Sequence, residues 1–213
     1  MIECITLENI HCFSGNPICE QHRLRYRSII ERQGWDVPVV RGLEYDQYDN
    51  PAAYYLVKRN EEGKAVGSSR LYPTDRPYML QEIFGGLVTN RSIPCDPAVW
   101  EGSRFCVDQT LPPDERRKIT QELVVAYLEF CMTFDVKAIV GVMYPVYWRN
   151  VFIRNGWNVD WMGELQKSSE GHKIVAGYLR ASPEVLEHVR KTTGIEQPVL
   201  NLGMQDERIR HAA

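Results

Sequence analysis

Three carboxylates fall within one short stretch of this 213-residue chain, which reads E-Y-D-Q-Y-D-N from position 44 to position 50. Like charges this close repel one another unless a cation compensates them or water screens them. Glu44, Asp46 and Asp49 are therefore compatible with a metal site, a solvated acidic loop or a cradle for a cationic ligand. A calcium loop needs a different spacing and a glycine, so the metal is the least favoured interpretation. Taken alone, the stretch favours the solvated loop.

Several common chemical motifs are missing from the sequence. No G-x-G-x-x-G or G-x-x-x-x-G-K-[ST] pattern predicts a nucleotide site, and no G-x-S-x-G pattern predicts a hydrolase nucleophile. The five histidines are isolated, and none of the six cysteines belongs to a C-x-x-C pair. We therefore predict no metal site, and reduced cysteines that pack as small hydrophobic side chains.

The composition predicts a globular protein with a real core, since 44% of the residues are hydrophobic and 25% are charged. The length suits one domain spanning residues 1–213. A net charge of −3 and a pI near 6.0 do not suggest a nucleic-acid partner. No apolar run reaches the ~20 residues that span a bilayer, and the first residues lack the apolar segment of a signal peptide. We therefore expect no membrane partner and a cytoplasmic location.

The first half of the chain is predicted to be rich in strands. Residues 1–9 alternate as a strand does, and residues 17–33 have a helical pattern that stops at a glycine. Residues 52–60 and 64–73 are predicted to pair as a hairpin around a turn that contains glycine. Residues 97–108 form a further strand candidate, which ends before two consecutive prolines.

The second half alternates helices and strands. Its clearest helix spans residues 114–135, with a stripe of apolar side chains at helical spacing. That stripe consists of Ile119, Leu123, Tyr127, Phe130 and Phe134. A buried strand at 137–145, a helix at 147–157, a strand at 173–182 and a helix at 183–194 follow.

This order of elements predicts an α/β fold, a three-layer α-β-α sandwich around a central mixed sheet. A long helix between two central strands is also the arrangement of the acyl-CoA N-acyltransferases of GCN5 type, which is an analogy of fold only. The residues after Gln197 are expected to be irregular.

Four stretches change the interpretation of the acidic segment when they are taken together. They read LRYRSIIERQGW (24–35), EYDQYDN (44–50), VGSSRLYPT (66–74) and WEGSRFCVD (100–108). In this order and at these intervals the set resembles the acyl-homoserine-lactone synthases, the autoinducer synthases of bacterial quorum sensing. The residues that match the family pattern are Arg25, Trp35, Glu44, Asp46, Asp49, Arg70, Phe84, Glu101, Ser103, Arg104, Phe105, Val107 and Asp108.

The resemblance covers roughly the first half of the chain and is specific, although Ile29 stands where many members carry phenylalanine. It lies closest to the branch of the family that uses acyl-coenzyme A donors. It implies that S-adenosylmethionine (SAM) and an acyl thioester are substrates and that no cofactor is needed. The SAM amine would attack the thioester, and the SAM carboxylate would then close the lactone and expel 5′-methylthioadenosine.

The residue types suit that chemistry. SAM presents an ammonium, a sulfonium and a carboxylate, so its pocket needs acids, a guanidinium and aromatic faces. The resemblance assigns SAM binding and the surrounding ionic network to Arg25, Trp35, Asp46, Asp49, Arg70, Phe84 and Phe105. Only the joint pattern supports these roles, because each residue alone is commoner in a core or on a surface.

The amine must lose a proton before it attacks, and Glu101 is the predicted base, acting directly or through a water. Ser103 and Arg104, two and three residues along the same strand, complete the predicted catalytic set. A purely structural pairing of Glu101 with Arg104 is the alternative.

The acyl pocket is predicted from the apolar residues of the second half together with Ile29. Its members would be Ile29, Val142, Met143, Tyr144, Tyr147, Trp148 and Phe152. The bulky rings favour a short, branched or aryl acyl group, while ordinary core packing is the alternative.

The acyl donor is harder to predict. An acidic acyl-carrier protein would need a basic surface, which Arg116, Arg117, Lys118, Arg149 and Arg154 could supply. The rival functions are an N-acyltransferase that acts on another amine and a regulator that binds SAM or coenzyme A without catalysis. The segment QTLPPDERRK lacks the glycines of a pyrophosphate loop, which disfavours the first rival.

Overall fold

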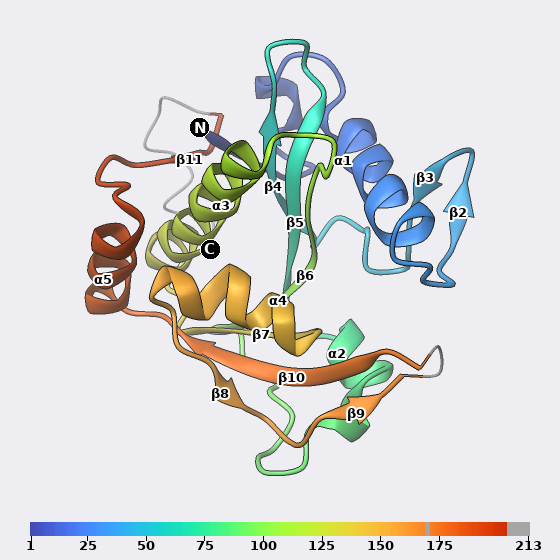
Figure 1. The fold of residues 1–213 in the computed structure, drawn as a ribbon, viewed down its shortest axis with the longest axis vertical. Helices are drawn as coiled ribbons and strands as arrows, with labels where there is room; N and C mark the ends of the chain where they lie inside the picture. The colour runs from blue at the N-terminus through green and yellow to red at the C-terminus, as the bar shows by residue number, and fades with distance from the viewer. Residues whose placement is uncertain (169–170, 204–213) are drawn as a thin grey trace.

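The computed structural model describes residues 1–168 and 171–203, and within them nine strands form one mixed sheet (Figure 1). Eight strands follow the order β11-β1-β4-β5-β6-β7-β10-β8, and β9 pairs with β10. The parallel pairs are β1 with β11 and β6 with β7. The strands are β1 (Ile2–Ile5), β4 (Tyr54–Arg59), β5 (Ala65–Pro73), β6 (Val99–Val107), β7 (Ala138–Met143), β8 (Asp160–Trp161), β9 (Gln166–Lys167), β10 (Lys173–Arg180) and β11 (Leu200–Asn201). A separate hairpin joins β2 (Val39–Val40) to β3 (Leu43–Glu44).

Helices cover both faces of this sheet, which confirms the predicted three-layer arrangement. Successive side chains of a strand point to opposite faces, so β4 sends Leu56 into one core and Tyr55 and Val57 into the other. The first core packs against α3 (Pro113–Thr133) and α5 (Pro183–Thr193). The second packs against α1 (Pro17–Arg25) and α2 (Met79–Glu82).

Helix α3 is the element that the sequence predicted best. Proline occupies its first turn, where the missing N–H costs nothing, and two acids follow there. Ile119, Leu123, Tyr127 and Phe130 are buried as the spacing predicted, and Phe134 packs at the edge of the core.

Some predicted elements are broken or were missed. The helix predicted at 17–33 is α1 followed by a wider π-type turn at Tyr26–Glu31. The helix predicted at 147–157 divides into α4 (Pro145–Tyr147), a π-type turn at Trp148–Phe152 and a 3-10 turn at Ile153–Asn155. Further 3-10 turns lie at Ile10–Cys12 and Gly85–Leu87. The prediction of an irregular end is wrong for β11, and residues 204–213 lie outside the described part.

Strands β6 and β7 pair over only three residues each before they part. Their parallel register joins Val99–Glu101 to Ala138–Val140, although both strands continue. Gly141 permits the close approach at the branch, because a Cβ there would lie 2.6 Å from the Gly102 carbonyl oxygen. Beyond it, the two strands open a cleft in the middle of the sheet.

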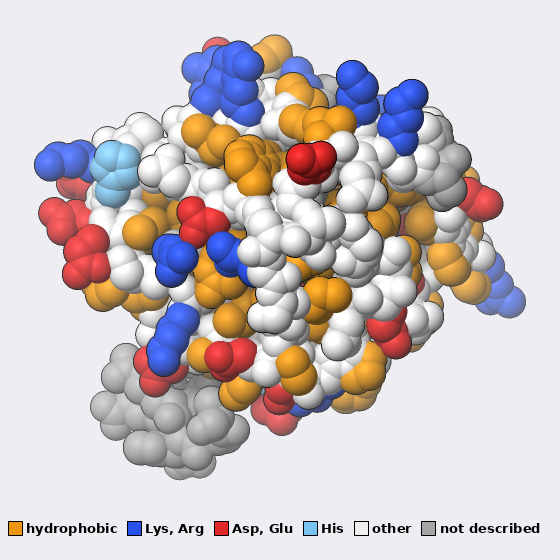
Figure 2. Space-filling view, turned by 90° about the horizontal axis from the view of Figure 1, so that it is seen from below, with side chains coloured by type: hydrophobic (Ala, Val, Ile, Leu, Met, Phe, Trp, Pro, Cys, Tyr) orange, Lys and Arg blue, Asp and Glu red, His pale blue; other side chains and the backbone are white. Residues whose placement is uncertain are grey.

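Two observations bear on the predicted absence of a membrane segment and on the distribution of charge. No helix among residues 1–168 and 171–203 is long and apolar enough to cross a membrane. Figure 2 shows hydrophobic side chains interspersed with acidic and basic ones on the face seen from below.

Candidate active site

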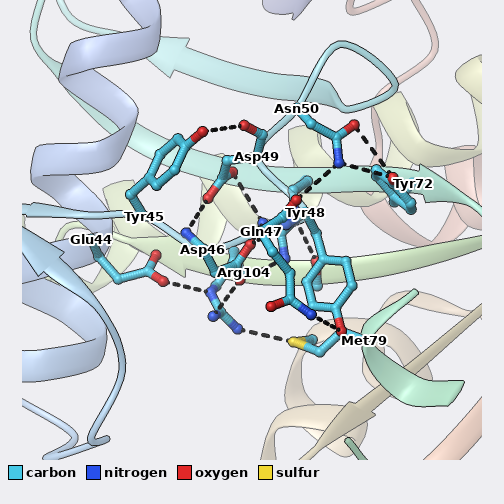
Figure 3. Close-up of polar contacts among 12 residues, drawn as sticks. Glu44, Tyr45, Asp46, Gln47, Tyr48, Asp49, Asn50, Tyr72, Met79 and Arg104 are labelled. Atoms are coloured by element: carbon cyan, nitrogen blue, oxygen red, sulfur yellow. Dashed lines mark hydrogen bonds and ion pairs between the residues drawn. The ribbon is translucent and has the colours of Figure 1, made fainter. Parts of the chain in front are cut away.

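Three arginines and three carboxylates form a closed ring of alternating charge beside the cleft. Arg25, on α1, forms an ion pair with Glu44 and donates hydrogen bonds of 2.7 and 2.8 Å to the two carboxylate oxygens of Asp49. Arg70, on β5, continues the ring from Asp49 at 3.0 Å to Asp46 at 2.5 Å. Arg104, on β6, closes it by binding Asp46 at 2.7 Å and Glu44 at 3.1 Å. Figure 3 shows Arg104 between Glu44, Asp46 and the sulfur of Met79.

The ring is largely removed from water. The side chains of Arg25, Arg70, Glu44 and Asp49 are fully buried, and only Asp46 and Arg104 keep 10% and 13% exposure. Burial opposes ionisation of Asp49, but hydrogen bonds and charge from Arg25 outweigh it and hold the pKa of Asp49 well below its usual range. The three positive and three negative charges compensate one another. The ring therefore has no excess of negative charge, which a binding site built from acids alone would have.

Turn chemistry in the acidic stretch aims its carboxylates inward. Asp46 accepts a hydrogen bond from the Tyr48 amide at 2.9 Å, and Asp49 accepts one from the Asp46 amide at 2.9 Å. The hydroxyl of Tyr45 donates to the Asp49 carbonyl at 2.8 Å, and that of Tyr55 donates to the Asp49 carboxylate at 3.0 Å. The bond from Asp46 to the amide two residues on is an Asx turn, in which a short polar side chain folds back on its own backbone. The stretch is therefore a rigid loop and not a solvated one.

A pocket of about 390 Å³ lies between this loop, the N-terminal segment 35–38, the α2 segment and the opened strands. Its lining is mostly apolar and aromatic. Eleven of the predicted site residues line it: Ile29, Trp35, Asp46, Phe84, Ser103, Arg104, Phe105, Val142, Met143, Tyr144 and Tyr147. Trp35 stacks on Tyr144 with ring centroids 6.0 Å apart, which joins the N-terminal segment to the end of β7.

The other six predicted residues, Glu101 among them, lie away from the lining. Arg25, Asp49 and Arg70 are buried behind the wall, where they hold the ring together. Trp148 and Phe152 belong to the core on the α3 face, and the Trp148 indole donates to the Val175 carbonyl at 3.0 Å. The two rings fill the core between the sheet and α3 and are absent from the lining of this pocket, so their role at the acyl group stays a prediction.

Glu101 is fully buried at the point where β6 and β7 part. Its carboxylate accepts hydrogen bonds from the backbone amides of Leu80 at 2.6 Å and Met79 at 3.2 Å. Burial raises the pKa of Glu101 to about 7, although the Arg70 charge and the two amides act in the opposite direction. A carboxyl group with this pKa can exchange a proton near neutral pH.

The alternative pairing of Glu101 with Arg104 does not form. Arg104 donates to Glu44, Asp46 and the Met79 sulfur, and its backbone adopts a left-handed φ of 56°. Such a backbone costs on the order of 1–3 kcal/mol in a residue with a side chain. It falls where the pairing of β5 with β6 shifts register. Ser103, one residue earlier, accepts a hydrogen bond from Arg70 at 3.1 Å.

Sequence reasoning undervalued Glu44 and missed α2. An extended chain would place Glu44 and Asp49 on opposite faces, but Glu44 ends β3 and a turn follows it. The available signal for Glu44 was that the three acids of residues 44–50 equal in number the three arginines of the pattern, Arg25, Arg70 and Arg104. Helix α2 is one turn long, so it shows no periodicity that could reveal it.

A second cavity of about 570 Å³ adjoins the first and has a basic rim. Four side chains, Gln33, Phe105, Met143 and Tyr147, line both cavities. The second cavity is also lined by Arg32, Arg116, Arg117 and Arg154. Of the five basic residues predicted for a docking surface, Arg116, Arg117 and Arg154 lie here.

Metal ligation finds no support in this site. Among the residues that the structure describes, no group of three or more His, Cys, Asp or Glu is arranged to hold a metal ion. The three acids of the opening stretch are instead paired with arginines.

The mixed sheet opens between two parallel strands, with a buried carboxylate at the branch and an apolar cleft beside it, which agrees with the fold predicted by analogy with the acyl-CoA N-acyltransferases. Comparison with known proteins makes this specific. Residues 9–189 match the family model of the autoinducer synthases. The chain belongs to that family.

Curated relatives carry the same assignment. An acyl-homoserine-lactone synthase of Pseudomonas aeruginosa is 32% identical over 179 residues, which are 83% of this chain and 85% of the relative. An isovaleryl-homoserine lactone synthase of Bradyrhizobium diazoefficiens is 33% identical over 167 residues, which are 76% of this chain and 72% of the relative.

A solved structure resembles the chain over nearly its whole length. It is the CoA-dependent acyl-homoserine lactone synthase BjaI with SAM and isopentyl-CoA, at 27% identity and a TM-score of 0.84. The alignment covers 95% of this chain and 92% of that one. The predicted family and the mixed α/β fold are thus confirmed, and the chain is an acyltransferase.

Proposed function

We propose that this protein makes an N-acyl-homoserine lactone from SAM and an acyl-coenzyme A, with release of 5′-methylthioadenosine. The observation that carries the proposal is the position of Glu101, a buried carboxyl group with a pKa near 7 at the mouth of the opened strands. The pocket beside it offers both an anion and a cation, Asp46 and Arg104, among aromatic side chains. That combination suits a zwitterionic sulfonium amino acid.

Acylation of the amine is the first step. Glu101 does not line the pocket, so it takes the ammonium proton of SAM through a water. The amine nitrogen then bonds to the thioester carbonyl carbon, and the carbon–sulfur bond of the thioester breaks. The nitrogen loses its second proton as the amide forms, and the thiolate takes up that proton and leaves as the free thiol. Backbone amides along the open edges of β6 and β7 supply donors for the oxyanion.

Lactone closure is the second step. A carboxylate oxygen of the acylated substrate bonds to its γ-carbon, and the bond from that carbon to the sulfonium sulfur breaks. The negative and positive charges cancel, so 5′-methylthioadenosine leaves as a neutral thioether. Asp46 and Arg104 orient the two charged groups, and the surrounding ring prevents either side chain from turning away.

The second cavity is the proposed entry of the donor. Its arginines suit the phosphates of coenzyme A, and the four shared side chains form the passage through which the acyl group reaches the amine. The BjaI structure with isopentyl-CoA supports a coenzyme A donor. An acidic acyl-carrier protein is the alternative donor for the same basic rim.

The acyl group is proposed to be short and branched, or aryl. Trp148 and Phe152 fill the core behind the pocket, which leaves the acyl chain only the volume above Val142, Met143 and Tyr144. The name of the Bradyrhizobium relative, an isovaleryl-homoserine lactone synthase, supports the same class of substrate.

The direct test incubates the purified protein with SAM and a panel of acyl-coenzyme A and acyl-carrier thioesters. Methylthioadenosine release and product mass are followed together. We expect stoichiometric thiol, methylthioadenosine and acyl-homoserine lactone, fastest with branched or aryl acyl-coenzyme A. Thioester consumption with another amine and no methylthioadenosine would instead identify an ordinary N-acyltransferase.

A further inference from the structure

Helix α2 is held at its amino end by two residues of the predicted site and at its carboxyl end by a tyrosine that lines the pocket. At its amino end, the amides of Met79 and Leu80 donate to Glu101, and the Met79 sulfur accepts from Arg104 at 3.2 Å. At its carboxyl end, Glu82 accepts a hydrogen bond from the Tyr48 hydroxyl at 2.7 Å. One turn of helix therefore connects the acidic loop to the carboxylate that we propose as the base.

Tyr48 is itself fixed by the ionic ring. The Arg70 guanidinium lies over its ring at 5.6 Å, and only 3% of Tyr48 is exposed. Gln47, its neighbour in the loop, donates to both the Tyr48 hydroxyl at 3.0 Å and Glu82 at 3.3 Å. A continuous series of contacts therefore runs from Arg70 of the ionic ring through Tyr48 to the carboxylate of Glu82. Glu82 itself is an exposed residue.

We propose, on the basis of the proposed function, that Glu82 is a positioning residue: its bond to Tyr48 holds the two amides of α2 against Glu101 and so sets the proton affinity of the base. Glu82 touches no reacting atom and does not line the pocket. Its effect passes through the helix, because a turn this short moves as a unit when one end is released.

The direction of the effect follows from the hydrogen bonds. Amide donors stabilise the ionised form of a carboxyl group, so their withdrawal raises its pKa. The other charged and titratable groups that interact with Glu101 are Arg70 on β5, Arg104 on β6, Tyr78 before α2, Tyr48 in the loop and Tyr127 on α3. None of these side chains is removed when Glu82 is changed.

Two variants of Glu82 distinguish the effect of its hydrogen bonding to the loop from the effect of its negative charge. Glu82→Gln removes the charge but keeps a carbonyl oxygen that accepts from Tyr48, whereas Glu82→Ala removes both. Loss of a negative charge near Glu101 would lower its pKa, and this happens in both variants. The difference between the two therefore reports the hydrogen bonds that the side chain of residue 82 accepts from the loop, from Tyr48 at 2.7 Å and from Gln47 at 3.3 Å, and not its charge. Gln81→Ala, on the same turn, is the matched control for surface changes, since Gln81 is exposed.

The experiment is an infrared titration of the protonated carboxyl band of Glu101 in the intact protein, assigned by its absence in Glu101→Gln. We expect the midpoint in Glu82→Ala to lie about 0.5–1 pH unit above that in Glu82→Gln, and Gln81→Ala to match the wild type. Equal midpoints in the two Glu82 variants would overturn the proposal. This titration needs no substrate, so it decides the inference even if the synthase assay fails.

The acid limb of kcat/KM provides the second readout. We expect Glu82→Ala to lose about three- to tenfold at pH 6.5 and little at pH 8.5, and Glu82→Gln to recover that loss. A loss that is equal at all pH values and is not recovered by Glu82→Gln would indicate a merely structural role and would also overturn the proposal.

Discussion

Arg25 and Asp49 are joined by two parallel hydrogen bonds of 2.7 and 2.8 Å, and neither side chain has any exposed surface. This bidentate geometry is the strongest form of ion pair in proteins. It fixes α1 to the loop that follows β3, across 24 residues of sequence. Neither residue lines the pocket, so the pair lies behind its wall and anchors it.

The ring should be a structural necessity, and Arg25→Met tests this. The substitution leaves Glu44 and Asp49 buried with one partner fewer each, which costs on the order of 3–5 kcal/mol. Urea unfolding followed by circular dichroism measures the loss. Lys64→Met, which removes an exposed pair with Glu62, is the control and should change nothing measurable. A loss for Arg25→Met no larger than the control's would show that the buried pair is dispensable.

Asp46 and Asp49 should behave differently although they belong to one stretch. Asp46 lines the pocket and Asp49 does not. We expect Asp46→Asn to raise the KM for SAM by about tenfold or more, since a hydrogen bond to a charged group contributes roughly 1.5–3 kcal/mol. Asp49→Asn should lower the unfolding free energy while the folded protein keeps its KM. Similar KM values in both variants would contradict this division of roles.

The division could not be predicted from the sequence. The order of elements predicted the sheet and its helix layers because periodicity reports which side chains face a core. The motif residues also predicted which side chains meet around Asp46 and Arg104. Periodicity cannot report the path of a turn. The backbone between Glu44 and Asp49 is fixed by an Asx turn at Asp46 and by the bond from the Asp46 amide to the Asp49 carboxylate, and this path decides which carboxylate faces the pocket.

A similar limit applies to the apolar residues. Trp148 and Tyr147 are neighbours in the sequence with the same hydrophobic character, yet one fills the core and the other lines the pocket. The wide π-type turn that starts at Trp148 directs the ring between the sheet and α3. A π-type turn departs from the 3.6-residue spacing on which sequence patterns depend.

The basic rim of the second cavity should recognise the nucleotide end of the donor. The double variant Arg116→Ala/Arg154→Ala should raise the KM for acyl-coenzyme A by about tenfold, because guanidinium–phosphate contacts are lost. It should leave the KM for the matching acyl-pantetheine, which lacks the nucleotide, unchanged. Arg180→Ala, which removes an exposed arginine of β10, is the control. An equal rise with both donors would place the defect in the passage and not in phosphate binding.

The substitution Glu101→Gln tests whether the buried carboxyl group acts as the general base. We expect kcat to fall by about 10²–10⁴-fold, the usual contribution of a general base. The wild-type kcat/KM should rise with pH through about 7, where Glu101 loses its proton. A variant with unreduced kcat would exclude Glu101 as the base.

The ionisation of Glu101 should also make the stability of the wild-type protein depend on pH, and stability should fall with rising pH where kcat/KM rises. The folded pKa of Glu101, about 7, lies above the ordinary glutamate value of 4.5, so between these two pH values the native state holds a proton that the unfolded chain has released. Wild-type stability therefore decreases as pH rises through this window, by about 3 kcal/mol if the full difference is expressed. Glutamine does not titrate and lacks this decrease. The unfolding free energy of Glu101→Gln relative to wild type should consequently increase from pH 4.5 to pH 8, and a difference independent of pH would show that burial does not raise the pKa of this carboxyl group.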